Sequence, residues 1–412
     1  MNKIAADILV AGAGPAGLSA ALAASERSTV TLVDDNPNPG GQIWRAEKGK
    51  ITSKEAARLV TAIKERRINV INGATVFASP AKNTLLASTL SGTTEFEYQK
   101  LIIATGARER FLPFPGWTLP NVFGAGGLQA LVKGGFDAAG RKVVIAGTGP
   151  LLLAVGDYLK AKGAQVILIA EQAPAAKINR FAAGLWSSPA KLLQAANLRR
   201  RLLGIKYLTD CWITSVGGRE RVEYVELTRN GKTWKVDCDF IACGFHLVPN
   251  NELATLLGCR IENRFVVVDD LQTTSVDNIY CAGEPTGIGG VEAALIEGKI
   301  AGLAASGQAE ATSAHLSSRK KAHKFADALN RTFALRGELK TLAAPDTIVC
   351  RCEDVAYGRL TEFDNSREAK FQTRCVMGPC QVRICAAATE FLFGWDQGSV
   401  RAPIFPVKIE EL

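Results

Sequence analysis

A glycine-rich turn near the N-terminus is the feature that most constrains how this chain folds. A short apolar run at 8–10 leads into the pattern Gly12-x-Gly14-x-x-Gly17, and an Ala-rich stretch follows it. Strand, glycine turn and helix in this order are the context in which G-x-G-x-x-G indicates a dinucleotide-binding fold. Gly12 permits the tight turn, Gly14 lets the backbone approach a pyrophosphate, and Gly17 lets the helix pack against the strand.

An acidic pair follows the next apolar run. Residues 30–33 predict a second strand, which ends in Asp34 and Asp35. An acidic side chain at this place can accept hydrogen bonds from the ribose hydroxyls of an adenosine, while the helix N-terminus offers N–H groups to the phosphates. The alternative is a glycine-rich turn in an unrelated α/β protein, but strand, helix and acid together favour the dinucleotide site.

Composition excludes several other classes of protein. The 412 residues predict two or three domains, and 47% hydrophobic residues can form large cores. The net charge of +9 is spread along the chain, and the densest basic run, 199–201, lacks the interleaved aromatics of a nucleic-acid site. No apolar run is long enough for a bilayer, and the N-terminus lacks a signal-peptide pattern. We therefore expect a cytoplasmic protein, in which ten cysteines would not form a disulfide framework.

A second glycine turn repeats the opening architecture. The apolar run 142–146 precedes Gly147-Thr148-Gly149-Pro150, and a further strand pattern ends at Glu171. The third glycine is replaced by Leu152, which is expected to push the helix off the strand or change the angle of the turn. If a nucleotide binds, Glu171 favours an unphosphorylated ribose. The alternative is a vestigial domain with a structural role. The expected site comprises Gly147, Gly149, Pro150 and Glu171.

Cysteines cluster near the C-terminus. Cys350 and Cys352 form one close pair, Cys380 and Cys385 form another, and Cys375 is an additional thiol that could replace a ligand. Four thiolates in two pairs suit either zinc or an iron–sulfur cluster. The remaining five cysteines are expected to be small buried hydrophobes.

Four separated segments resemble the flavoproteins with two dinucleotide-binding domains, the fold of glutathione and thioredoxin reductases. They are the opening glycine turn, Gly41-Gln42, Ala104-Thr105-Gly106 and 279–284. The resemblance implies FAD. Relatives carry Asp where this chain has Glu284, so its carboxylate must reach from one methylene further back. The implied FAD-binding residues are Gly12, Gly14, Pro15, Ala16, Gly17, Asp34, Asp35, Gly41, Gln42, Val76, Thr105, Gly106, Gly283, Glu284, Val291 and Glu292.

Two short cysteine motifs near the C-terminus carry a second resemblance. Cys-Arg-Cys-Glu at 350–353 and Met-Gly-Pro-Cys-Gln at 377–381 resemble the [2Fe–2S] module of bacterioferritin-associated ferredoxin. They resemble even more the version fused to flavoprotein subunits of opine, hydroxyproline and proline dehydrogenases and of cyanide synthase. This resemblance implies a [2Fe–2S] cluster, although relatives usually have glycine at Val376 and Val382. The implied ligands are Cys350, Cys352, Cys380 and Cys385.

The expected fold is α/β, with two Rossmann-like domains, the second inserted in the first, and a small C-terminal [2Fe–2S] domain. The FAD-binding domain comprises 1–107 and 244–310, and the second nucleotide-binding domain comprises 108–243. A helical linker at 311–345 leads to the [2Fe–2S] domain and tail at 346–412.

No catalytic residue stands out in the sequence. The expected function therefore comes from the resemblance. The chain would be the electron-transfer subunit of a heteromer. A partner β subunit, FAD-containing and similar to amino-acid oxidases, would oxidise the C–N bond of an opine such as octopine or nopaline, of D-hydroxyproline, of proline or of glycine. Electrons would pass through [2Fe–2S] to FAD and on to an acceptor, which could be peripheral to the inner face of the membrane. A small third subunit, FMN at a subunit interface, and ATP or NAD(H) in the second site belong to the same expectation.

Two other functions stay open. One is an NADH-dependent reductase that delivers electrons through the cluster, and the other is a non-redox scaffold subunit with structural zinc. The C-x-x-C pair of a disulfide reductase is missing from both places where that fold carries it, which argues against a thiol relay.

Overall fold

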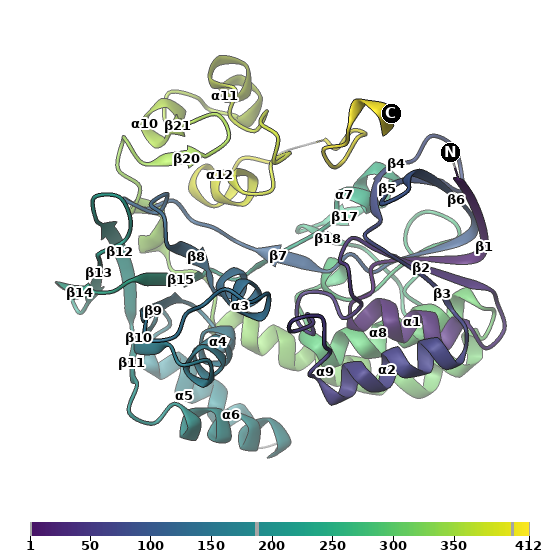
Figure 1. Cartoon of the computed structure of the whole chain (residues 1–412), viewed down its shortest axis with the longest axis horizontal. Helices are drawn as coiled ribbons and strands as arrows, with labels where there is room; N and C mark the ends of the chain where they lie inside the picture. Colours follow the sequence, from purple (N-terminus) through teal and green to yellow (C-terminus); the bar gives the residue numbers. More distant parts are fainter. Residues whose placement is uncertain (1, 186–188, 397–398, 412) are drawn as a thin grey trace. The chain divides into compact units, whose positions relative to one another are not determined.

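The computed structural model describes residues 2–185, 189–396 and 399–411 (Figure 1). The chain divides into two compact units. The first contains Met1–Arg108, Pro249–Asp327 and Gly398–Leu412, and the second contains Glu109–Val248 and Ala328–Gln397. Each unit is built on a largely parallel sheet of its own, which confirms the α/β class expected from the two glycine turns. Within the described residues, no helix is both long and apolar enough to cross a membrane.

The first unit is organised on a seven-stranded sheet with the order β3-β2-β1-β6-β5-β4, in which β19 also pairs with β6. Its strands are β1 (Asn2–Ala11), β2 (Val30–Asp34), β3 (Asn69–Asn72), β4 (Thr75–Ala78), β5 (Thr84–Thr89), β6 (Gly92–Ile103) and β19 (Ile279–Cys281). β4 and β5 form an antiparallel meander with β6, whereas the other neighbours are parallel. Because β19 pairs with residues 101–103 of β6, a late strand completes the sheet begun at the N-terminus.

Two helices of this unit, α1 (Pro15–Ala24) and α8 (Gly290–Ala305), pack with their backbones almost in contact. A Cβ atom on Gly298 would lie 2.1 Å from the carbonyl oxygen of Ala16, and one on Gly302 would lie 2.3 Å from that of Ala20. Only glycine permits this approach, because a Cβ atom never comes so close to a backbone oxygen.

A third helix, α2 (Lys54–Glu65), is amphipathic. Ser53 caps it by accepting a hydrogen bond from the N–H of Ala56, 3.3 Å away, and the helix buries one apolar face. The other elements of the unit are α7 (Glu252–Leu256), β17 (Ile261–Glu262), β18 (Phe265–Val266), η2 (Glu284–Thr286), η3 (Ala309–Thr312), η5 (Ile409–Glu411) and most of α9 (Ser313–Thr332).

The C-terminal tail belongs to the first unit. The N–H of Ile404 donates to the carbonyl of Phe77 over 2.8 Å, and the Ser88 hydroxyl donates to the Glu411 carboxylate over 2.8 Å. The tail therefore lies on the β4–β5–β6 meander rather than with the cysteines that precede it in the chain.

The second unit contains a parallel sheet of five strands in the order β11-β10-β9-β15-β8. They are β8 (Val122–Gly124), β9 (Lys142–Gly147), β10 (Gln165–Glu171), β11 (Lys206–Thr209) and β15 (Phe240–Gly244). Its first four helices are α3 (Ala125–Lys133), α4 (Pro150–Ala161), α5 (Ala175–Gly184) and α6 (Pro189–Arg201).

Three strands between β11 and β15 form a separate antiparallel meander. They are β12 (Cys211–Gly217), β13 (Tyr224–Arg229) and β14 (Lys232–Asp237). Asn230 and Gly231 connect the last two strands with positive φ at both residues, as a type I′ hairpin requires and as their sequence predicts. β7 (Ala107–Glu109) and β16 (Leu247–Pro249) form a separate two-stranded sheet.

The cysteine segment of the second unit is small and has its own apolar core. Its elements are η4 (Gly337–Thr341), β20 (Ile348–Cys350), β21 (Val355–Ala356), α10 (Tyr357–Leu360), α11 (Ser366–Thr373) and α12 (Cys385–Phe393). Val349, Leu360 and Trp395 are buried in this core together with the cysteines. The indole N–H of Trp117 donates to the carbonyl of Ile348 over 2.6 Å and so attaches β20 to the loop before β8.

Replacing Gly298 by Ala is expected to lower the free energy of unfolding by about 1–3 kcal/mol, because the added methyl group must separate α1 from α8. Denaturant unfolding followed by circular dichroism measures the change. Gly184→Ala is the matched control, since Gly184 is helical and nothing lies within 4 Å of its missing Cβ. Equal stability of the two variants would show that the α1–α8 approach does not limit stability.

Candidate cofactor and metal sites

The opening glycine turn has the geometry that its spacing predicts. A Cβ on Gly12, whose φ is +110°, would lie 2.2 Å from the carbonyl oxygen of Ala104, and one on Gly17 would lie 1.7 Å from that of Gly12. These two glycines are required by packing within the protein. A Cβ on Gly14 would meet only the Cα of Gly41, 4.0 Å away, so space remains for a ligand to approach the backbone. Pro15 and Ala16 are the first two residues of α1 and directly follow Gly14.

The Gly40–Gln42 loop lies against the same turn. The N–H of Gly40 donates to the carbonyl of Ala13 over 2.8 Å, and this brings Gly41 beside Gly14. Gln42 is exposed, and its Oε1 accepts from Arg45 over 2.7 Å. Arg45 also donates to Asn36 over 3.0 Å, so it joins this loop to the end of β2. Sequence reasoning missed Arg45, because a single arginine in a loop carries no pattern.

The two acids after β2 have different roles. Asp34 is buried, and its carboxylate accepts from the N–H of Ala13 and, over 2.8 Å, from that of Asn36. Asp35 is exposed and accepts from the Asn36 side chain over 2.7 Å. Asp34 therefore holds the glycine turn in place through Ala13, whereas Asp35 is exposed to solvent.

Two further predicted residues lie near strand ends in this unit. Thr105 directly follows Ala104, the residue that contacts Gly12, and its hydroxyl donates to the carbonyl of Asn250 over 2.7 Å. Gly106 comes next, with a φ of +69°. Val76 lies in β4, two residues after Ala74, whose N–H donates to the carbonyl of Asp34 over 2.9 Å. Thr105 and Gly106 thus follow the end of β6, and Val76 lies close to the end of β2.

The late motif reaches the start of α1. A Cβ on Gly283 would lie 2.9 Å from the Cβ of Ala16. Glu284 follows, and its Oε1 accepts from the N–H of Gly290 over 3.0 Å. Val291 and Glu292 form the first turn of α8. Segments from both ends of the unit's sequence therefore meet at the N-terminus of α1, where a phosphate is favoured.

Glu284 has an acceptor that the described residues leave unpaired. Its Oε2 atom is buried and has no hydrogen-bond partner within the described part of the chain. Burial raises the pKa of Glu284 to about 7. A buried lone acceptor is costly unless a donor reaches it, so this atom fits a hydroxyl group of a bound flavin side chain.

A buried acid behind Glu284 was not predicted. Glu297 is 2% exposed, and its Oε2 accepts from the N–H of Gly283 over 2.7 Å and from the Thr286 hydroxyl over 3.0 Å. Its Oε1 lies 2.5 Å from Nε2 of His323. Glu297 thus fixes the turn that presents Glu284. A charged residue on the apolar face of α8 is the signal that could have found it.

Leu152 of the second glycine turn packs against a glycine of a neighbouring strand. Leu152 is fully buried, and α4 begins at Pro150 as the pattern predicts. A Cβ on Gly244 would lie 2.8 Å from Leu152 Cδ2. The glycine missing from α4 is therefore replaced by one in β15, which leaves room for the leucine. The backbone of the two turns differs, because φ is +94° at Gly149 and −74° at Gly14, which agrees with the expected change in the turn.

Glu171 is directed into the protein. It is fully buried, its Oε2 accepts from the N–H of Gly149 over 2.7 Å, and its Oε1 accepts from that of Ala173 over 2.8 Å. Desolvation raises the pKa of Glu171 to about 7. This carboxylate is therefore bonded to the glycine turn at one oxygen and to the segment after β10 at the other.

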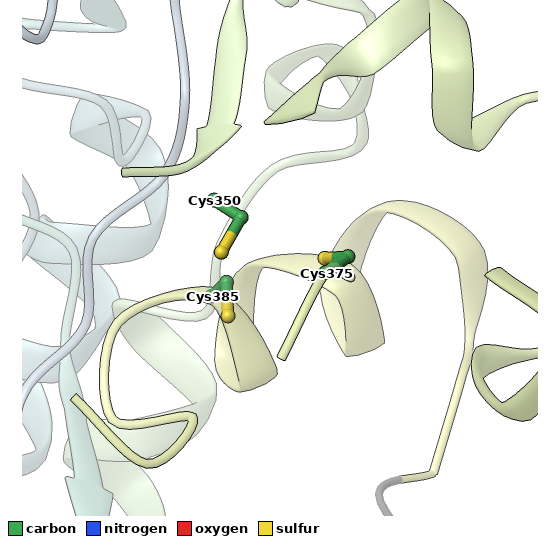
Figure 2. A group of neighbouring side chains, drawn as sticks. All are labelled: Cys350, Cys375 and Cys385. Carbon is green, nitrogen blue, oxygen red and sulfur yellow. The ribbon is translucent and has the colours of Figure 1, made fainter. Parts of the chain in front are cut away.

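The C-terminal thiols gather in one place. The sulfur atoms of Cys350, Cys375 and Cys385 all lie within 4.8 Å of one another, and all three residues are buried. Figure 2 shows that they come from three separate segments: the end of β20, the turn after α11 and the first residue of α12. The Cys380 thiol contacts both Cys352 and Cys385. The fold therefore brings the four predicted ligands together and adds Cys375 to them.

Contacts among the thiols favour a thiolate in this cluster. Hydrogen bonds from Cys375 and Cys385 lower the pKa of Cys350, and the same bonds raise the pKa of both donors. By contrast, burial raises the pKa of Cys211 to about 11 and that of Cys238 to about 12. Thiolate is the form that binds metals, so the donor set at the C-terminus fits a thiolate-bound metal centre.

Comparison with known proteins agrees with this geometry. The profile of the family described as pyridine nucleotide-disulphide oxidoreductase matches residues 6–301. An opine oxidase subunit from Rhizobium meliloti is 29% identical over 98% of this chain and 87% of its own length. Hydrogen cyanide synthase subunit HcnB of Pseudomonas aeruginosa is 29% identical over 92% of this chain and 90% of its own. Both relatives are named as subunits.

Solved structures have the same fold. L-Proline dehydrogenase from P. horikoshii matches with a TM-score of 0.70 at 22% identity, over 100% of this chain and 80% of that one. Thioredoxin reductase from T. acidophilum matches with a TM-score of 0.58 at 19% identity, over 74% of this chain and 99% of that one. These likenesses confirm the fold predicted from the paired glycine turns.

Replacing Glu284 by Ala is expected to weaken FAD binding, because a buried acceptor is lost. Hydrogen bonds to charged groups contribute about 1.5–3 kcal/mol, so the Kd for FAD should rise roughly 10- to 100-fold. Titration of the apoprotein, followed by flavin fluorescence, gives the Kd. Glu284→Asp keeps the carboxylate and should retain most of the affinity. An unchanged Kd in the Ala variant would contradict a role for this carboxylate.

Proposed function

The chain belongs to the family of pyridine nucleotide-disulphide oxidoreductases, a family of flavin-dependent oxidoreductases, and we propose that it is the electron-transfer subunit of a heteromeric amino-acid or opine dehydrogenase. Its partner would be a FAD-containing subunit, similar to amino-acid oxidases, that oxidises a C–N bond. When bound, FAD exchanges one or two electrons and a [2Fe–2S] cluster exchanges one. The cluster of five thiols on a flavoprotein fold is the observation that supports this function most strongly.

The FAD site we propose is built from the residues around α1. Asp34 would hold the glycine turn for the adenosine ribose, and the N-terminus of α1 would bind the pyrophosphate. The unpaired Oε2 of Glu284 would accept a hydroxyl of the flavin side chain. Glu297 and His323 would keep Glu284 in position from behind.

We propose that Cys350, Cys352, Cys380 and Cys385 bind a [2Fe–2S] cluster. Thiolates are the usual ligands of such clusters, and the contacts among these cysteines lower the pKa of both Cys350 and Cys380. The sulfur of Cys375 lies within 4.8 Å of those of Cys350 and Cys385, so Cys375 competes with Cys352 for a ligand position. Zinc would suit the same thiols, and metal analysis separates the two centres.

A thiol relay has no support in the remaining cysteines. Cys211, Cys238, Cys243, Cys259 and Cys281 are all buried, free, and raised in pKa mainly by burial. Inert thiols of this kind do not exchange disulfides. Electrons from a partner subunit therefore remain the favoured source. A small third subunit, FMN at a subunit interface and an acceptor at the membrane stay predictions from the resemblance.

The cysteine assignment predicts a specific order of variants. Cys350→Ser, Cys380→Ser and Cys385→Ser should each lose iron and acid-labile sulfide after oxygen-free purification, whereas Cys375→Ser should retain both. Cys211→Ser is the control for a buried thiol outside the cluster. Loss in Cys375→Ser with retention in Cys352→Ser would replace Cys352 by Cys375 as a ligand. Wild-type protein that contains zinc but no iron would overturn the cluster.

The electron-transfer function is tested with the partner present. Co-expression with the amino-acid-oxidase-like subunit should give a complex whose flavin absorbance bleaches when an opine, D-hydroxyproline, proline or glycine is added without oxygen. Wild type and Cys350→Ser are compared in the same complex, because loss of the cluster should slow bleaching of the FAD in this chain. A complex that none of these compounds reduces would contradict the substrate class.

A further inference from the structure

A short segment of the second unit lies on its own nucleotide-binding fold. This segment, 333–336, follows α9 and is here named the strap. The Thr148 hydroxyl donates to the carbonyl of Phe333 over 2.9 Å. The Gln172 side chain donates to the carbonyl of Ala334 and accepts from the N–H of Arg336, both over 2.9 Å. Thr148 and Gln172 follow β9 and β10, so the strap lies at the carboxyl ends of these strands, where open α/β sheets bind ligands.

Phe333 fills the space beside the glycine turn. It is 5% exposed, and its Cβ and Cγ atoms lie 4.0 Å from the point where a Cβ of Gly149 would be. Its ring meets that of Phe181 edge to face, with 6.0 Å between centroids. The second glycine of the motif is the one that lets a pyrophosphate approach. Here the atoms nearest the missing Cβ of that glycine belong to a side chain of the same chain.

Arg336 secures the far end of the strap. Its guanidinium lies 2.8 Å from the Asp210 carboxylate and 2.7 Å from that of Glu338, and stacks 3.5 Å from the centre of the Trp212 ring. It also donates to the carbonyl of Gln172 over 3.3 Å. Both ends of the strap are therefore bonded to the second unit.

The polar groups that would recognise a nucleotide are already paired. The N–H of Gly149 donates to Glu171, and both oxygens of Glu171 are bonded to backbone N–H groups. Gln172 is 1% exposed, and its side-chain amide bonds the strap through both its nitrogen and its oxygen. In the first unit Asp34 is likewise bonded to backbone N–H groups, but Glu284 has an unpaired oxygen. The atom nearest the missing Cβ of Gly14 is the Cα of another glycine rather than a phenylalanine side chain.

We propose that the strap is the built-in occupant of the second nucleotide-binding fold, and that it excludes adenine nucleotides from that fold. The fold then acts as a binding site for its own chain, and neither NADH nor ATP is its ligand. The strap and a nucleotide would compete for the same backbone turn, so weakening the strap should open the site. This inference concerns the second fold alone and stands apart from the electron-transfer role proposed above.

The test measures nucleotide binding to the full-length, FAD-loaded chain by calorimetry, with ADP, ATP and NADH as probes. Wild-type protein is expected to bind none of them with a Kd below about 1 mM. The double variant Gln172→Ala, Phe333→Ala should bind ADP at least roughly tenfold more tightly than wild type. Phe371→Ala is the matched control, because Phe371 is an exposed phenylalanine of the same unit. Tight binding to wild type, or no gain in a folded double variant, would overturn the proposal.

Hydrogen exchange provides a second measurement if the double variant does not fold. The N–H of Arg336 should be protected in the wild-type chain and should exchange at least tenfold faster in Gln172→Ala, which removes its acceptor. Rapid exchange at Arg336 in the wild-type protein would overturn the proposal without any variant.

Discussion

Close approach of one backbone to another is the constraint on which the first unit depends. Gly17 lets α1 lie on the turn at Gly12, and Gly298 lets α8 lie on α1. Together these contacts bring the middle of α8 to the start of α1, although the two helices are far apart in the sequence. The position of Glu284 follows from them, because the turn that carries it is held between β19 and α8. A cofactor site is thus a consequence of packing that only glycine allows.

The two nucleotide-binding folds of this chain differ in which N–H of the glycine turn the acidic side chain bonds. In the first, Asp34 bonds the N–H of Ala13, the residue before Gly14, and leaves the space at Gly14 open. In the second, Glu171 is longer by one methylene and bonds the N–H of Gly149 itself. One N–H of the second turn is therefore already bonded to a carboxylate of the same chain. The same architecture therefore gives one site suited to a pyrophosphate and one that is satisfied internally.

Local patterns predicted the parts of the structure that local chemistry determines. Strand, turn and helix around Gly12 and around Gly147 follow from glycine spacing. Gly12, Gly17 and Gly147 are each required by a backbone oxygen of the same motif or of an adjacent strand end. Leu152 was expected to disturb the second turn, but its compensation by Gly244 depends on a contact between distant segments. Glu297 and the strap were missed for the same reason. Which thiols meet is equally non-local, so spacing could not place Cys375 among them.

The strap also explains why a fold with two glycine turns would keep the second one. It is followed closely by Leu339, which is 1% exposed in the apolar core of the second unit, and then by β20, which carries Cys350. The bond from Trp117 to Ile348 fixes β20 on the same unit. Anchoring the chain on both sides restricts where the cysteine segment can lie relative to the parallel sheet of that unit. A fixed attachment for the cysteine segment is a structural role that a nucleotide-binding fold can serve without binding a nucleotide.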